Sequence, residues 1–137
     1  MNGDWDGRTA PSLEDFDALA RRAYDGLPAP FRALCGDVVI HVADFAEDGV
    51  LADLGVEDPF ELTGLYEGAD ILSRSIDAAV SEPNHVHLYR QPVLAEWIEA
   101  GDIALHALIL HVLVHEIGHH FGLSDEDMHR IEDAAGA

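Results

Sequence analysis

The sequence predicts an α+β fold, in which a small mixed sheet of about three strands packs on a central helix with other helices at its flanks. One observation is a segment at 103–114 that is apolar except for two histidines and is too short to span a bilayer, as expected of a core helix. The other is a set of short runs with β-branched or alternating apolar residues, which predict strands at 38–42, 62–67 and 85–89.

The first elements are helical. Residues 1–11 show no periodicity, so we expect a flexible N-terminal tail followed by a single domain at 12–137. Ser12 is a predicted N-cap with Asp15 three residues later, and apolar residues at helical spacing continue to about residue 25. Two prolines then interrupt the pattern, and a helical turn is expected at 31–34 before the first strand.

The middle of the chain alternates short elements. A short helix at 48–55 should close at Gly55, and a loop or ragged strand is expected at 71–82. In the third strand His85, His87 and Tyr89 should share one face. Pro92 is expected to end that strand and to start a helix at 93–100, with an apolar stripe of Leu94, Trp97 and Ile98.

The C-terminal part contains two further predicted helices. Gly101 separates the first of them from the preceding helix, and Asp102 is its expected N-cap. This helix is apolar nearly all round, so it should be the most buried element. The last helix, at 126–134, should pack through Met128 and Ile131.

The composition limits the classes of partner. The chain has 137 residues, 48% of them hydrophobic, and a formal charge of −20 from 27 acidic residues against seven arginines. Such a charge repels nucleic acid and anionic membrane surfaces and favours neutral or basic peptides, although it also serves solubility. Cys35 is the single cysteine and the N-terminus has no signal-peptide pattern, so we expect a cytoplasmic protein.

The most specific pattern is H-E-x-x-H-x-x-G-x-x-D at 115–125. His115 and His119 are four residues apart, so on a helix both imidazoles can reach one metal ion while Glu116 flanks its vacant position. Gly122 can turn the chain and bring back Asp125 as third ligand. Among nearby carboxylates, Glu126 and Asp127 could compete with Asp125 for this place, and this alternative stays open.

The chain also resembles a known family. Its stretches at 62–68, 87–94 and 113–125 are similar to the small bacterial "minimal zincin" metallopeptidases. The resemblance implies a compact zincin-like fold, Zn²⁺ bound by His115, His119 and Asp125, and peptide-bond hydrolysis in which Glu116 assists the attack of a zinc-bound water. It implies no particular peptide or protein substrate and no oligomeric state.

Two other functions remain possible from sequence. One is a non-catalytic, zinc-stabilised protein-binding module. The other is a metal-dependent nuclease, because a bacterial ribosomal-RNA-processing family shares the H-x-x-x-H-x-x-G spacing. Glu116 and the acidic composition favour the peptidase, since that family has glycine after its first histidine and a nuclease needs a basic groove.

We also expect the strand at 85–89 to lie at the sheet edge beside the metal, where a peptide could add as an antiparallel strand. Tyr66, His87 and Tyr89 are the candidates for stabilising an oxyanion. His111 lies one turn before His115 and is expected to be a packed or supporting histidine.

Overall fold

A computed structural model of the protein describes residues 5–68 and 84–136. Its sheet contains β1 (Val38–Ala43), β2 (Gly64–Glu67) and β3 (Asn84–Tyr89) in the order β1-β3-β2. β3 is parallel to β1 and antiparallel to β2. The predicted mixed sheet is confirmed.

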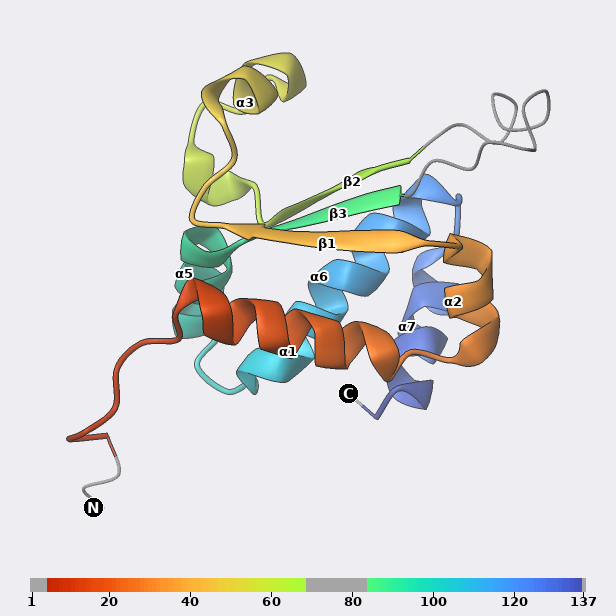
Figure 1. Cartoon of the computed structure of the whole chain (residues 1–137), viewed down its shortest axis with the longest axis horizontal. Coiled ribbons are helices and arrows are strands. Elements are labelled where there is room, and N and C mark those ends of the chain that lie inside the picture. The colour runs from red at the N-terminus through yellow and green to blue at the C-terminus, as the bar shows by residue number, and fades with distance from the viewer. Residues whose placement is uncertain (1–4, 69–83, 137) are drawn as a thin grey trace.

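The main helices lie together on one side of this sheet (Figure 1). They are α1 (Leu13–Asp25), α6 (Leu105–His120) and α7 (Asp125–Ala134). α6 is the buried centre of the fold, as predicted: eight of its residues are buried, and the core that they form includes residues of α1, β1, β2 and β3. The predicted α+β class is therefore confirmed. No described helix has the length and apolar character needed to cross a membrane.

α1 begins where the sequence predicts. The Ser12 hydroxyl accepts a hydrogen bond from the Asp15 amide at 3.1 Å, and the Asp15 carboxylate accepts one from the Ser12 amide at 2.9 Å. This capping box satisfies two amides that have no partner within the helix. Phe16 and Ala20 then form the buried face. The flexible tail at 1–11 stays a prediction, although the Pro11 carbonyl accepts a hydrogen bond from Arg90 at 2.9 Å.

The remaining described helices include the expected one closed by Gly55, and Gly55 is in the left-handed conformation. They are α2 (Ala29–Cys35), α3 (Asp48–Leu54), the 3-10 helix η1 (Pro59–Glu61) and α5 (Arg90–Ala100). The element expected at 71–82 lies outside the described residues.

Three details of the predicted helices are wrong. α5 starts at Arg90 instead of residue 93, because a proline in the first turn removes no intrahelical hydrogen bond, so Pro92 fits inside it. Ile98 is 75% exposed and does not join the apolar stripe. α6 begins after Ala104 with no side-chain cap, so Asp102 is not its N-cap.

The predicted position of the third strand is also wrong. β3 pairs with β1 on one side and with β2 on the other, so it is the central strand and not an edge. Pro92 had suggested an edge, but it lies beyond the strand in α5 and removes no hydrogen bond from the sheet. Within the described sheet, the edges are β1 and β2.

β2 approaches α6 closely at Gly64. A Cβ atom at Gly64 would lie 2.9 Å from Cγ1 of Val112 and 3.0 Å from the His87 carbonyl oxygen. Gly64→Ala should therefore destabilise the protein by about 1–3 kcal/mol through overpacking, measured as the free energy of unfolding in denaturant. Gly49→Ala is the matched control, because Gly49 has open space around it and should accept alanine without loss. Equal stability of the two variants would contradict this packing.

Cys35 provides a probe of unfolding. Its side chain is fully buried, and burial raises the pKa of the thiol to about 11. Because the thiolate is the nucleophile, the native protein should resist alkylation at pH 8 and at pH 9, both below that pKa. The denatured chain at the same pH should react fully, as mass spectrometry across a denaturant series would show. Rapid alkylation of the folded protein would contradict the burial of Cys35.

Candidate metal centre

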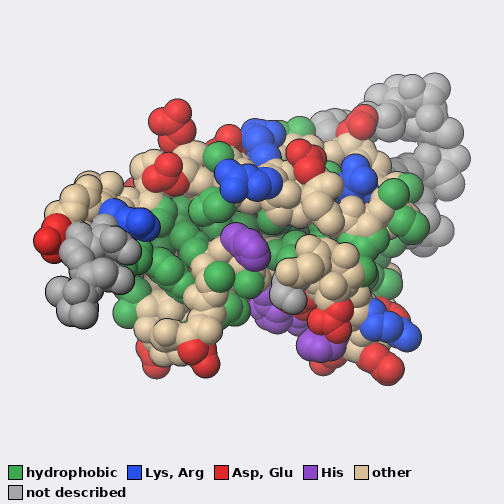
Figure 2. Space-filling model, turned by 90° about the horizontal axis from the view of Figure 1, so that it is seen from below, with side chains coloured by type: hydrophobic (Ala, Val, Ile, Leu, Met, Phe, Trp, Pro, Cys, Tyr) green, Lys and Arg blue, Asp and Glu red, His purple; other side chains and the backbone are tan. Residues whose placement is uncertain are grey.

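α6 presents a stripe of histidines on one face. His111, His115 and His119 follow one another at intervals of four residues, which places their side chains on the same side of a helix. The ring centroids of His111 and His115 are 3.9 Å apart, and those of His115 and His119 are 5.7 Å apart. Figure 2, seen from the helical side, shows histidine side chains at the surface among hydrophobic and acidic ones.

A tight turn brings the chain back to this stripe. Gly122 has a φ of 72°, and the amides of Gly122 and Leu123 donate to the carbonyls of His119 and Gly118 at 3.1 and 2.9 Å. These two hydrogen bonds close α6 in a Schellman motif, which requires the left-handed conformation that glycine adopts at low cost. The chain then enters α7, of which Asp125 is the first residue.

The turn places Asp125 beside two of the histidines. Ligand atoms of His115, His119 and Asp125 all lie within 4.8 Å of one another. Zinc binds imidazole nitrogen and carboxylate oxygen at about 2.0–2.2 Å, so donors around one ion are separated by about 3–4 Å. The donor types and their separations therefore fit zinc, with a small closing movement of the side chains.

The competing carboxylates are engaged elsewhere or lie outside the group. Arg130 pairs with the Asp127 carboxylate at 2.5 Å. Hydrogen bonds from Ser124 and Arg130 lower the pKa of Asp127, which stabilises its charge away from the histidines. Neither Asp127 nor Glu126 belongs to a three-ligand group of the described residues. Geometry thus favours Asp125 among the three.

Glu116 lies between α6 and β2. A Cβ atom at Gly64 would be 3.3 Å from Cγ of Glu116, so the glycine leaves room for this side chain beneath the strand. Burial raises the pKa of the Glu116 carboxyl, an effect that His119 partly opposes. The next turn of α6 also contacts β2, since the ring of His120 lies 4.5 Å from that of Tyr66. His120 is in neither described ligand group.

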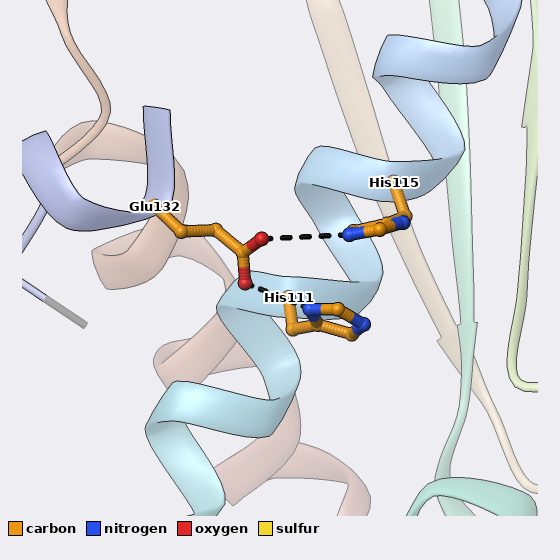
Figure 3. A group of neighbouring side chains, drawn as sticks. All are labelled: His111, His115 and Glu132. Carbon is orange, nitrogen blue, oxygen red and sulfur yellow. Dashed lines mark hydrogen bonds and ion pairs between the residues drawn. The ribbon is translucent and has the colours of Figure 1, made fainter. Parts of the chain in front are cut away.

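A second group of possible ligands shares His115. Figure 3 shows His111 and His115 of α6 facing Glu132 of α7. Nδ1 of His111 is 2.7 Å from Oε1 of Glu132, and Nε2 of His115 is 3.4 Å from Oε2. From sequence, Glu132 is a candidate only for a distant third zinc ligand, and it lies too near the motif for that role. The one sequence signal for this group is the position of His111, one turn before His115. The contribution of α7 depends on how the two helices pack, so sequence spacing does not predict it.

Other histidines form a cluster away from α6. His85 and His87 share a face of β3, as predicted, and the ring of His41 on β1 stacks on both at 5.1 and 4.7 Å. Val86 and Leu88 alternate with them and are fully buried in the core that contains α6. The cluster therefore lies on the opposite face of the sheet. His87 is consequently poorly placed to stabilise an oxyanion near Glu116.

Comparison with known families identifies the family of the chain. The profile of the zincin-like metallopeptidase family matches residues 35–135, a range that contains the whole sheet, α6 and the turn into α7. Among curated proteins, no match was found. The profile covers well over half of the 137 residues, so the chain belongs to the zincin-like metallopeptidase family.

Proposed function

We propose that the protein is a zinc-dependent peptidase in which Glu116 is the general base. The observation that carries this proposal is the position of Glu116, which is half-buried where α6 meets β2 and directly follows His115, a member of the group with His119 and Asp125. A base must be fixed close to the atom from which it takes a proton, and the position of this side chain between two packed elements restricts its movement.

Each residue has a defined task in this proposal. His115, His119 and Asp125 hold the ion and, as three protein ligands, leave a position for water or substrate. The ion would supply Lewis acidity, which polarises the scissile carbonyl and makes water more acidic. Glu116 accepts the proton of the attacking water and transfers it to the leaving amine.

We further propose that substrate lies along β2 instead of β3. β2 is an edge of the described sheet, and its residues Gly64 and Tyr66 contact the part of α6 that contains Glu116 and His120. A peptide added to such an edge gains backbone hydrogen bonds with little side-chain selectivity. The net charge of −20 would then favour peptides with Lys or Arg near the scissile bond.

Glu116→Gln should retain zinc and the fold but lose hydrolysis by at least about 100-fold, because a neutral amide cannot carry the proton. Metal analysis, circular dichroism and cleavage of a peptide that the parent hydrolyses would test this. Glu99→Gln is the control: it removes one negative charge from an exposed position of α5. Similar turnover by Glu116→Gln and the parent would exclude Glu116 as base. Separately, zinc retained by His115→Ala would exclude His115 as a metal ligand.

Substrate charge should affect kcat/KM through the acidic surface. For peptides that differ only in residues flanking the cut, Lys-flanked forms should be cleaved about tenfold or more faster than Glu-flanked forms at low salt. The difference should shrink at high ionic strength, because salt screens exposed charges. Equal kcat/KM values at low salt would argue against electrostatic selection of substrate.

A further inference from the structure

We propose that α6 and α7 form a second metal site from His111, His115 and Glu132, which competes with the proposed catalytic site for His115. This inference depends on the proposed function only in taking His115, His119 and Asp125 as the catalytic ligands. The ion would be zinc or another divalent metal that accepts imidazole nitrogen and carboxylate oxygen.

The second group repeats the donor chemistry of the first. Each has two histidines four residues apart on α6 and one carboxylate from α7, with ligand atoms within 4.8 Å of one another. Both oxygens of Glu132 face imidazole nitrogens, at 2.7 Å from His111 and 3.4 Å from His115 (Figure 3). Donors around one zinc ion are separated by about 3–4 Å, so the pair at 3.4 Å already fits and the hydrogen-bonded pair at 2.7 Å would move slightly apart.

The burial of Glu132 supports a cation at this place. Its side chain is only 12% exposed, and among the described residues its ion-pair partners are His111 and His115, with no arginine. A buried carboxylate is costly unless a positive charge or hydrogen bonds compensate it. A divalent ion between Glu132 and the two imidazoles would compensate the carboxylate without requiring a proton on either ring.

The two sites should exclude each other. Each draws on the same His115 imidazole, and a neutral imidazole offers one lone pair, so it coordinates one ion at a time. Occupancy should therefore stay at one ion per chain. In the second site, the residue after the first histidine is Val112, a buried apolar side chain, where the catalytic site has Glu116. An ion held there would lack a carboxylate directly after its first histidine, so it would be stored in an inactive position.

Metal binding by four forms of the full chain tests the proposal. Equilibrium dialysis with zinc, and visible absorption of the cobalt-loaded protein, would compare the parent with His119→Ala, His115→Ala and the double variant His119→Ala/Glu132→Gln. The parent and His119→Ala should each bind one ion, since the second site does not need His119. His115→Ala should lose both sites, and the double variant should bind at least about tenfold more weakly than His119→Ala.

The matched control is His119→Ala/Asp133→Asn. Asp133 follows Glu132 in α7 but is 65% exposed and pairs with His129, so removing its charge should leave the affinity of His119→Ala unchanged. Loss of binding in this control would overturn the proposal, because it would indicate diffuse attraction to acidic side chains. Circular dichroism confirms the fold of each variant, and His119→Gln replaces His119→Ala if the latter unfolds.

Three further results would overturn the proposal: no metal bound by folded His119→Ala, equal affinity in His119→Ala and the double variant, or two ions in the parent. The assay measures no hydrolysis, so an inactive parent leaves its outcome unaffected. Conversely, failure of the second site would leave the Glu116→Gln test of the proposed function intact.

Discussion

The fold and its site both depend on the burial of α6. Eight of its residues are buried, and strands on one side and helices on the other cover its apolar surface. Polar groups can be placed on such a helix only where a neighbouring element provides partners or a path to solvent. The histidine stripe and Glu116 occupy these places. The core packing that stabilises the protein therefore also restricts the orientation of its candidate ligands.

The packing of α7 on α6 explains why two carboxylates face one row of histidines. Asp125 and Glu132 are seven residues apart, about two helical turns, so they lie on the same face of α7. Met128 lies between them and is fully buried. A Cβ atom at Gly118 would be 2.5 Å from Sδ of Met128, so the glycine between the two histidines of the motif permits this close helix contact. The two ligand groups that share His115 follow from this packing, because it places both carboxylates opposite the same row of histidines.

The relation between β2 and Glu116 connects the sheet to the proposed chemistry. Gly64 allows the strand to approach α6, and Glu116 lies in the space that a larger side chain would occupy. In the proposed function, a peptide paired with β2, an edge of the described sheet, would extend the sheet beside this carboxylate. In the proposed function, the acidic composition would add a longer-range preference for basic substrates, but it has no part in forming the fold.

The sequence by itself determined the α+β class, the approximate extent of most described elements and the clustering of His115, His119 and Asp125. These features follow from local spacing: apolar periodicity, the capping box at Ser12 and the turn at Gly122 act over a few residues. Tertiary structure alone decided that β3 is central, that β2 is an edge of the described sheet beside Glu116, and that Glu132 faces His111 and His115. Strand order and helix packing join residues far apart in the chain, so no local pattern specifies them.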